Sequence, residues 1–489
     1  MSPKPRLSKS RFMSGRQCTL RLWNDWFHRE LATPVDAETQ ARFDEGNEVG
    51  EVARKRFPGV LVAADHRHSD EALSETARLL ADPTVEVLQE AAFEHQGGFA
   101  RVDILARRNG AWDVIEVKSV LDVDETHRMD AAFQGWVVAG AGLPVGSISV
   151  MALNREYRYQ GGELDLEGLF RLEDITAEAR ALAPLMGSEL TQFQALLQQT
   201  DAPDMAPGRH CASPYGCPYL AHCTRHWPAV ADPVDWLPGF GPAKYLPLHA
   251  AGIHSMVDLP LDSLTAQQLQ VVTCHRDNQP WVSDGLGEAL KPFAPPIHFL
   301  DFETFAPAVP RLIGTGPREV VPVQWSCHTM PAEGHLTHRD FLAEGLADPR
   351  EAFATSLLKA LETEGSICVY SSYEQGVLRR LAESLPQLTP ELNALVARLV
   401  DLLPVIRENI YLPAFHGSYS IKKVLPALVP GFDYSQLQVQ DGLQAGLAFA
   451  KMLDEPDPDS RQAVRNDLLA YCGQDTLAMV KIRVALRSL

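Results

Sequence analysis

The sequence has no long hydrophobic run: no apolar stretch approaches the roughly 20 residues that a transmembrane helix needs. The N-terminal MSPKPRLSKSRFMSGR is basic and lacks the apolar segment of a secretory signal peptide. These absences argue against a membrane protein and a secreted one, so we expect a cytoplasmic protein without a membrane partner. At 489 residues the chain exceeds what one hydrophobic core organises, and we expect two or three domains.

Cysteine is also scarce, with 8 residues in the chain. Disulfides are not expected in a reducing compartment, so cysteines that cluster are better explained as ligands of a metal or an iron-sulfur cluster. The stretch HCASPYGCPYLAHC at residues 210–223 places Cys211, Cys217 and Cys223 with five residues between neighbours. The usual centres take four thiolates, which leaves one ligand to be found elsewhere.

Positive charge is in deficit, because 44 lysines and arginines face 63 acidic residues and the net charge is −19. Such a chain is not expected to coat nucleic acid by bulk electrostatics, since phosphate neutralisation by Lys and Arg supplies most non-specific affinity. Any nucleic-acid contact must be local. One basic stretch without an acid is either a solvated tail or such a contact: Lys4, Arg6, Lys9, Arg11, Arg16 and Arg21.

Three segments differ in pattern. Residues 1–228 mix predicted helices and strands, residues 229–290 are turn-rich, and residues 291–489 open with the proline-rich break KPFAPP. The expected fold class is α/β, with a mixed sheet covered by helices in the C-terminal segment. The predicted helices are near 37–56, 69–81, 125–140, 173–200 and 349–363, and the predicted strands lie in a pair within 92–118 and near 296–305, 320–328, 336–342 and 366–372.

A hairpin is predicted in FARVDILARRNGAWDVIEVKSV, where Asn109-Gly110 separates two apolar runs. If Arg108 faces Ala111, then Asp103 lies directly across from Glu116 on the same face of the sheet. Such a pair would bring two carboxylates within roughly 5 Å of each other at their Cβ atoms.

Two carboxylates this close repel unless a cation lies between them or one stays protonated, and a divalent metal would satisfy both Asp103 and Glu116. Lys118, two residues beyond Glu116 on the same face, would then contact the scissile phosphate or the attacking water. The alternative is a surface hairpin whose polar face is solvated.

The pattern D-x(12)-E-V-K resembles the PD-(D/E)XK nuclease superfamily. RecB-like members of the iron-sulfur type carry one cysteine before the nuclease core and three after it, and Cys18 is the only other cysteine in the first 228 residues. The resemblance implies a [4Fe-4S] cluster that clamps the N-terminal segment to the end of a nuclease domain spanning 1–228. Zinc is the competing interpretation, but its ligands are usually paired at C-x(2–4)-C. The implied ligands are Cys18, Cys211, Cys217 and Cys223.

Two motifs of that family are incomplete. Gly50 stands where relatives have a metal-binding histidine, with Glu48 and Glu51 as candidate substitutes, and Gln134 is followed by Val138 where relatives have tyrosine. These departures leave a second hypothesis open, in which the first site has decayed and the chain is a nucleic-acid-binding or regulatory protein.

The middle segment contains LPGFGPAK at residues 237–244, which looks like the glycine turn of a helix-hairpin-helix. Glycines there let backbone N–H groups approach a phosphate without reading sequence. Pro247 falls within the second helix of such a module, and a linker rich in glycine and proline explains the composition as well.

A second set of carboxylates lies in the C-terminal segment. In the strand IHFLDFETF both faces are largely apolar, so Asp301 and Glu303 project together from a buried strand. On the final helix Asp475 occupies a position of the apolar stripe, with Tyr471 one turn earlier. Buried carboxylates are normally paired or bound to metal, and a salt bridge to a neighbouring Lys or Arg is the alternative for Asp475.

The patterns D-x-E and Y-x(3)-D together resemble the DEDD-type 3′–5′ exonucleases of the RNase H-like fold, in which two metal ions flank the scissile phosphate. Glu374, in YSSYE, takes the place of the aspartate of the family's second motif. SYSIKKVL at 418–425 looks like the family's S-h-K helix, and VDLLPVIR around Asp401 like one of its strands. An iron-sulfur RecB-like nuclease domain followed by an RNase H-like domain that opens with FLDFETF resembles, over essentially the full chain, a family of largely uncharacterised bacterial proteins.

The predicted function is a metal-dependent nuclease that acts on DNA. The C-terminal site would remove nucleotides from a 3′ end, and the N-terminal site would cut the same substrate, each with Mg²⁺ or Mn²⁺. Arg311 and Arg318 are candidate phosphate contacts. An RNA-directed exonuclease is a further alternative because nothing in the sequence selects deoxyribose, and the sequence identifies no protein partner. The candidate catalytic residues are Asp103, Glu116, Lys118, Asp301, Glu303, Glu374, Tyr471 and Asp475.

Overall fold

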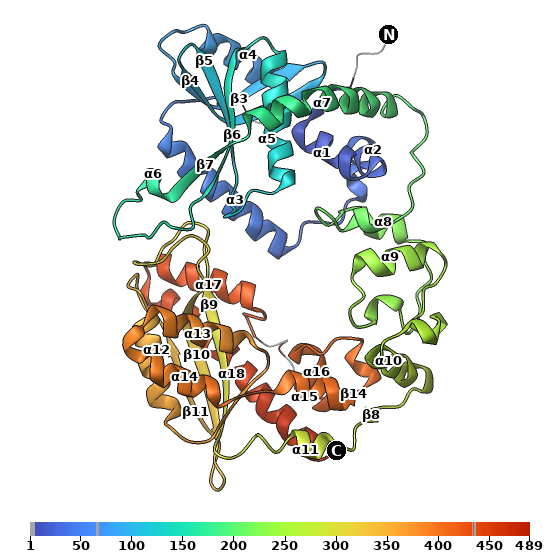
Figure 1. The fold of residues 1–489 in the computed structure, drawn as a ribbon, viewed down its shortest axis with the longest axis vertical. Coiled ribbons are helices and arrows are strands. Elements are labelled where there is room, and N and C mark those ends of the chain that lie inside the picture. The colour runs from blue at the N-terminus through green and yellow to red at the C-terminus, as the bar shows by residue number, and fades with distance from the viewer. Residues whose placement is uncertain (1–4, 65–67, 433, 435–436) are drawn as a thin grey trace.

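The computed structural model describes residues 5–64, 68–432, 434 and 437–489. It has a mixed α/β fold with one seven-stranded and one five-stranded mixed sheet, as the sequence predicted in its coarser terms. Figure 1 shows the N-terminal sheet and its helices above, the C-terminal sheet and its helices below, and the segment with α8 to α10 joining them along one side. Among the described residues, no helix is long and apolar enough to span a bilayer.

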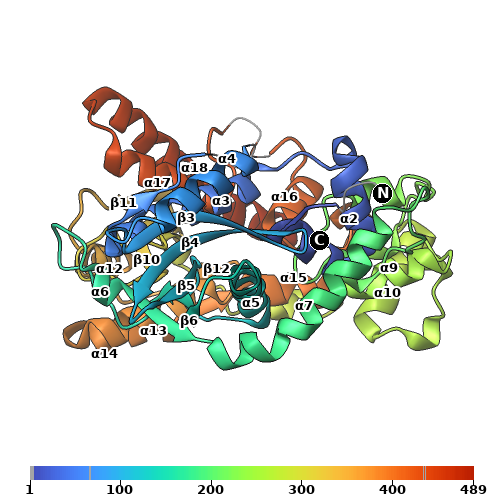
Figure 2. The same cartoon turned by 90° about the horizontal axis from the view of Figure 1, so that it is seen from above.

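The N-terminal sheet has the order β2-β3-β4-β5-β6-β7, and β1 pairs in parallel with the beginning of β4. The helix pair α3 and α4 lies on one side of this sheet and α5 and α7 on the other (Figure 2). The strands are β1 Leu7–Ser8, β2 Val60–Leu61, β3 Val87–His95, β4 Gly98–Arg108, β5 Ala111–Val117, β6 Val145–Leu153 and β7 Phe170–Asp174. The helices are α1 Lys9–Gln17, α2 Thr19–Phe27, α3 Ala37–Arg56, α4 Ser69–Leu80, α5 Glu125–Gly140, α6 Leu166–Leu169 and α7 Thr176–Leu196.

The hairpin register is the predicted one. Arg108 pairs with Ala111 and Ile104 with Ile115, so the next position along brings Asp103 opposite Glu116. Asn109 and Gly110 both have positive φ, as a two-residue hairpin turn of this kind requires. The prediction of a strand pair within 92–118 was incomplete, because β3 adds a third strand, and β6 and β7 were not predicted.

The middle segment packs on the C-terminal part. Trp281 of β8 pairs with Tyr411 of β14, and the buried Val234, Leu237 and Met256 belong to the same apolar core as Tyr411. The turn before α9 contains Gly239 with φ +76°, whose carbonyl accepts a hydrogen bond from Lys244 Nζ at 2.9 Å. The elements are α8 Leu220–Thr224, α9 Pro242–Ala250 with Pro247 inside it, α10 Ala266–Asp277, β8 Trp281–Val282 and α11 Leu286–Ala289.

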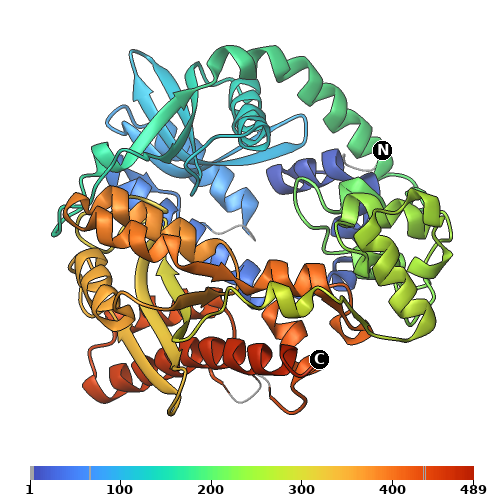
Figure 3. The ribbon, with the colours of Figure 1, turned by 60° about the horizontal axis from the view of Figure 1, so that its bottom comes forward.

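The C-terminal sheet has the order β11-β10-β9-β12-β13, with β10 antiparallel to β9 and β11, and β12 parallel to β9 and β13. The long helix α18 lies on one face and α12 to α14 on the other (Figure 3). The strands are β9 Ile297–Phe305, β10 Val321–Met330, β11 Thr337–Leu342, β12 Ser366–Val369, β13 Leu399–Asp401 and β14 Ile410–Tyr411. The helices are α12 Arg350–Leu361, α13 Tyr373–Ser384, α14 Thr389–Ala397, α15 Leu402–Asn409, α16 Ile421–Leu428, α17 Gly442–Asp454 and α18 Pro458–Leu486.

The expected strand in VDLLPVIR was mostly wrong. Only Leu399–Asp401 is extended, and α15 begins at Leu402 because the carboxylate of Asp401 accepts the backbone N–H of Leu403 at 2.9 Å. Asp401 is therefore an N-cap residue, which satisfies one of the free N–H groups at the start of the helix.

The loop after β9 joins the two halves of the molecule. Ala308 and Val309 are buried in the same apolar cluster as Val49 of α3. Arg318 pairs with Glu45 at 2.6 Å and donates to the carbonyl of Ser119, while a second candidate phosphate contact, Arg311, pairs with Asp454. Both arginines thus make internal contacts instead of facing solvent as unpaired cations. Lys4 of the basic stretch lies outside the described residues.

Candidate active sites

Strand β9 positions the first two carboxylates of the C-terminal site. Asp301 pairs with Ser326 of β10 and Glu303 with Gln324. Leu300 and Phe302 pack into the core under α12 to α14, while Asp301 and Glu303 point to the opposite face, towards α18. Alternation along the strand therefore brings both acids to one side, as predicted.

Helix α18 supplies the third carboxylate, Asp475, which is 8% exposed. Its Oδ1 accepts a hydrogen bond from Tyr434 at 2.6 Å, and Tyr471 lies one turn earlier on the same face. Cys472 donates its thiol proton to Oδ2 of Asp301 at an S···O distance of 3.5 Å. The predicted salt-bridge alternative for Asp475 is not observed in the part of the chain that the structure describes, because its side-chain partners there are tyrosines.

Glu374, in the first turn of α13, completes a set of four converging acids. It is 4% exposed, and its Oε2 is buried with no hydrogen-bond partner among the described residues. The four acids line a pocket of about 210 Å³ together with Tyr370, Ser371, Ile421, Lys422, Tyr471 and Met479. The sequence predicted all four acids, whereas Tyr434 and Cys472 were not singled out.

The electrostatics of this pocket favour a bound cation. Burial and, to a lesser degree, repulsion from Asp475 raise the pKa of Glu303 to about 8. Burial and, to a lesser degree, repulsion from nearby acids raise the pKa of Glu374 to about 7. Burial and the same neighbours raise the pKa of Asp301 well above its usual value. Lys422 opposes the shift of Glu303, and it is the one cationic side chain among the described residues that line the pocket. Oxygen ligands of this kind suit Mg²⁺ or Mn²⁺.

Without divalent metal, the stability of the protein is expected to fall as the pH rises from about 4.5 to about 8. Folded Glu303 keeps its proton up to about pH 8, whereas a glutamate in the unfolded chain loses it near 4.5. The folded state therefore binds more protons in this window, and the stabilisation present below the lower value is lost as the pH passes the upper one. Because a cation takes the place of the proton, Mg²⁺ should raise the melting temperature more at high pH than at low pH.

Thermal unfolding in EDTA and in Mg²⁺, measured across this pH range, tests the prediction. Glu303→Gln removes the titrating group with the higher of the two pKa values and should flatten the dependence. A Mg²⁺-induced shift that is equally large at every pH in the wild-type protein would contradict it.

The N-terminal site is built on the hairpin. Asp103 accepts the backbone N–H of Val117 at 2.7 Å, and Glu116 is 2% exposed on the face covered by α5. Lys118 Nζ lies 2.9 Å from Glu116 Oε1 and 2.5 Å from Asp130 on α5. The structure thus brings the three predicted residues together and adds Asp130.

A second lysine, Lys9, enters this site from the N-terminal basic stretch. Its Nζ lies 2.5 Å from Glu116 Oε1 and 3.8 Å from Asp130. The cause is topological. β1 pairs with the start of β4, and α1 begins at Lys9, capped by Ser8, in contact with β4 and α5. For this residue the solvated-tail alternative is wrong.

The two lysines change the charge balance that the sequence suggested. Burial opposes ionisation of Glu116, but Lys118 and Lys9 together lower its pKa far below the usual range. Burial, followed by repulsion from Glu116, raises the pKa of Asp103 well above its usual value. The prediction of a divalent ion between the two carboxylates was therefore incomplete, because it did not include the positive charge of Lys9.

The structure places the residues of the two incomplete motifs relative to the acidic pair. Gln134 donates to Glu116 Oε2, so the glutamine belongs to the site, and Val138 is buried in the core beneath it. Glu48 interacts with Arg311 and other groups at the domain interface and Glu51 is exposed, so neither replaces the missing histidine beside Asp103. Glu90 of β3 does act on Asp103 electrostatically.

The four predicted cysteine ligands come together from both ends of the N-terminal half. Cys18, between α1 and α2, interacts electrostatically with Cys211, and Cys217 and Cys223 interact with both. Backbone N–H groups of Leu20 and Arg21 donate to the sulfur of Cys18, and that of Tyr219 donates to Cys217.

The surrounding loop is tied to the N-terminal helices. Gln17 Nε2 donates to the carbonyls of His210 and Tyr215 at 2.7 and 2.6 Å, and Tyr219 donates to Asp25 at 2.7 Å. Burial raises the pKa of Cys217 to about 11, so a thiolate here needs a compensating cation. The residues therefore fit a thiolate-bound centre.

A family model described as "Domain of unknown function (DUF2779)" matches residues 298–420. The matched region contains Asp301, Glu303 and Glu374, and it excludes Asp475 and the N-terminal site. No curated protein matches the chain.

Proposed function

We propose that the protein is a metal-dependent nuclease whose C-terminal site is a 3′–5′ exonuclease. The observation that carries the proposal is the convergence of four carboxylates from β9, α13 and α18 in one pocket, with a single lysine to balance them among the described lining residues. Such a set has little structural benefit, because buried acids destabilise the fold unless they are protonated or bound to a cation. It is the donor set that two-metal phosphodiester hydrolysis uses.

Each residue of this pocket has a part in the proposed reaction. Asp301, Glu303, Glu374 and Asp475 would hold the ions, which when bound would activate water and stabilise the leaving oxygen. Tyr434 fixes the carboxylate of Asp475 through its 2.6 Å hydrogen bond, and Tyr471 is placed to orient the attacking water. Lys422 adds a positive charge where a phosphate would enter.

The topology supports the two fold families proposed. When the strands of the C-terminal sheet are numbered along the chain, their spatial order is third, second, first, fourth, fifth. The first two are antiparallel and the fourth is parallel to the first, which agrees with an RNase H-like domain at 291–489. The N-terminal hairpin with α5 over its acidic face agrees with a RecB-like PD-(D/E)XK domain at 1–228 that binds a [4Fe-4S] cluster. For 229–290 we retain the helix-hairpin-helix-like linker as a proposal.

A labelled-substrate assay tests the class of reaction. The purified protein is incubated with 3′- and 5′-labelled DNA and RNA, single-stranded and duplex, in Mg²⁺, Mn²⁺ or EDTA. The proposal expects stepwise shortening of DNA from the 3′ end that EDTA abolishes. Shortening of RNA alone would support the RNA-directed alternative, and no metal-dependent cleavage of any substrate would refute the nuclease proposal.

One observation favours a second candidate function for the first site. Lys9 and Lys118 both contact the same oxygen of Glu116, where a cation would bind in an active site of this type. With Gly50 in place of the family's histidine, this arrangement supports a decayed site that binds nucleic acid and feeds or regulates the second site.

The substitution Asp103→Ala separates these functions. If the first site is active, the variant should lose internal cleavage while 3′ trimming by the second site continues, as product sizes on a denaturing gel would reveal. Asp113→Ala is the matched control, because Asp113 lies on the same hairpin with its side chain on the opposite face. An Asp103→Ala variant that cleaves like the wild-type protein would support the hypothesis that the first site has decayed.

A further inference from the structure

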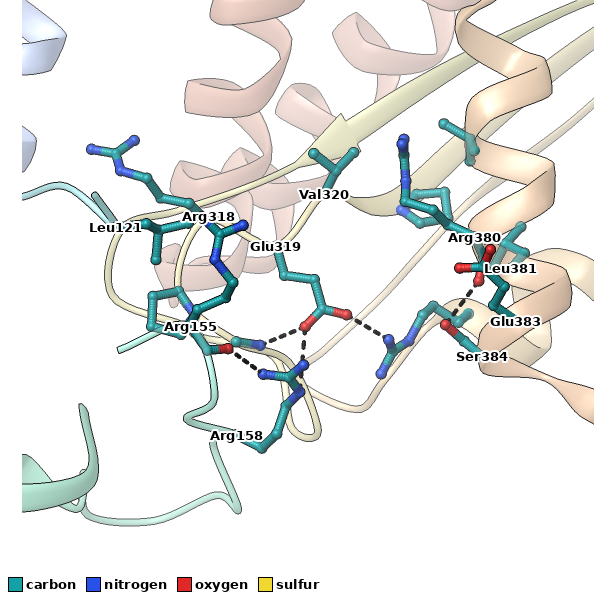
Figure 4. Close-up of a pocket in the computed structure, with 15 residues that line it drawn as sticks. Leu121, Arg155, Arg158, Arg318, Glu319, Val320, Arg380, Leu381, Glu383 and Ser384 are labelled. Atoms are coloured by element: carbon teal, nitrogen blue, oxygen red, sulfur yellow. Dashed lines mark hydrogen bonds and ion pairs between the residues drawn. The ribbon is translucent and has the colours of Figure 1, made fainter. Parts of the chain in front are cut away.

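Five arginines line a pocket of about 360 Å³ where the two halves of the molecule meet. Figure 4 shows Arg155, Arg158 and Arg318 on one side, Arg380 on the other, and Glu319 between them. Glu319 and Glu383 are the acidic side chains among the described residues that line it. In a chain with a net charge of −19, this pocket is a local concentration of positive charge. The five arginines are Arg155, Arg158, Arg318, Arg350 and Arg380.

Internal partners fix three of these arginines and shape the wall. Arg158 donates to two neighbouring backbone carbonyls and lies 3.8 Å from Glu319. Arg350 binds Glu319 at 2.7 Å and Asp348 at 2.6 Å, and Arg318 binds Glu45 at 2.6 Å. These contacts hold the loop after β9 rigidly against both halves of the molecule. The charge of Glu319 is thereby balanced within the wall, which leaves the pocket positive.

The remaining arginines have donors to offer a ligand. Arg380 is exposed, and its guanidinium makes no hydrogen bond or ion pair with any residue that the structure describes. The side chain of Arg155 is 62% exposed, and its one ion pair among the described residues is with Asp122, which is 83% exposed. An ion pair this exposed contributes little, so an incoming anion can replace it.

Two arginines of the pocket belong to, or contact, chain segments that also carry candidate site residues. Arg380 follows Glu374 by six residues on α13, about 9 Å along the helix axis. On the other side, Arg318 donates to the carbonyl of Ser119, the residue directly after Lys118.

We propose that this arginine pocket binds phosphodiester groups of the nucleic-acid substrate away from the scissile bond. The inference rests on the proposed nuclease function and specifies how the substrate is held beyond the scissile bond. Arginine suits this task because its planar guanidinium donates two parallel hydrogen bonds to phosphate oxygens. Contacts to the backbone give affinity without sequence preference.

Replacement of Arg380 by alanine tests the pocket, with Arg379→Ala as the matched control. Arg379 is the neighbouring exposed arginine on α13, and it does not line the pocket. Binding of a fluorescent single strand of about 20 nucleotides is followed by anisotropy in Ca²⁺. We expect Arg380→Ala to weaken binding about fivefold and to lower the slope of log Kd against log salt by about 0.7, the value for one lost phosphate contact. Arg379→Ala should change neither.

A second variant addresses the opposite wall. Arg155→Ala should produce a similar loss, and the losses should multiply in the double variant because the two side chains lie on different halves of the molecule. Equal affinities and salt slopes for Arg380→Ala and Arg379→Ala would overturn the proposal. It would also be overturned if inorganic phosphate occupied the pocket without changing the affinity of the protein for the strand. If the wild-type protein cuts DNA in Mg²⁺ while the variants match the control, only the pocket assignment fails; if it neither binds nor cuts, the nuclease proposal fails too.

Discussion

Asp301→Asn is expected to reduce Mg²⁺-dependent trimming of a 3′ end at least about 100-fold. Asparagine keeps the size of the side chain but removes the charge that holds the ion, and even partners one layer further from a metal typically cost 10–100-fold when replaced. The loss should appear in kcat as well as in metal affinity, because the same carboxylate holds the ion in the transition state. Steady-state rates over a Mg²⁺ titration would measure both.

The same substitution should stabilise the metal-free protein near neutral pH. Burial and the repulsion from Asp475 and Glu303 raise the pKa of Asp301 well above its usual value, so folding at pH 7 requires that this group take up a proton. Asparagine removes that requirement. We therefore expect a higher melting temperature in EDTA together with lost activity, a combination that misfolding would not produce.

Asp340→Asn is the matched control, since this acid is exposed on β11 of the same sheet. It should leave activity and melting temperature close to those of the wild type. An Asp301→Asn enzyme that keeps a tenth or more of the wild-type rate would contradict the proposed role of the four-carboxylate pocket.

Local sequence patterns predicted those parts of the sites that depend on local geometry. The Asn109-Gly110 turn fixes the register that places Asp103 opposite Glu116, and strand alternation puts Asp301 and Glu303 on one face. The apolar stripe of α18 likewise predicted the inward position of Asp475, which is 8% exposed.

The residues that were missed depend on long-range pairing. Lys9 reaches Glu116 across 107 positions because β1 pairs with β4, and no periodicity within either segment indicates that pairing. Tyr434 reaches Asp475 from a turn-rich segment that lacks a repeating pattern. The strand around Asp401 was expected to continue beyond this residue, because a short apolar run is ambiguous between strand and helix. The N-cap preference of aspartate was the signal that would have placed its end.

The second large effect is expected from Cys18→Ser. Cys18 is the one proposed cluster ligand that comes from the N-terminal helices, so its loss would remove the cluster's link between these helices and the loop with the other three ligands. Binding of such a centre contributes directly to folding, and its loss should remove several kcal/mol from a net stability of about 5–15 kcal/mol. Because α1 also carries Lys9, the damage should reach the first site before the second.

The measurements are iron and sulfide content, absorbance near 400 nm (roughly the region of iron–thiolate charge transfer), and limited proteolysis of residues 1–228. Cys274→Ala is the control, because Cys274 is equally buried on α10 but lies outside the cysteine cluster. The control should keep its colour, and Cys18→Ser should lose both colour and protease resistance while the Asp301-dependent reaction persists in part. If the wild-type protein contains one zinc and no iron, the four cysteines form a zinc site instead of a cluster site. If the wild-type protein contains neither iron nor zinc, and Cys18→Ser is as stable as Cys274→Ala, the four cysteines have no role as ligands.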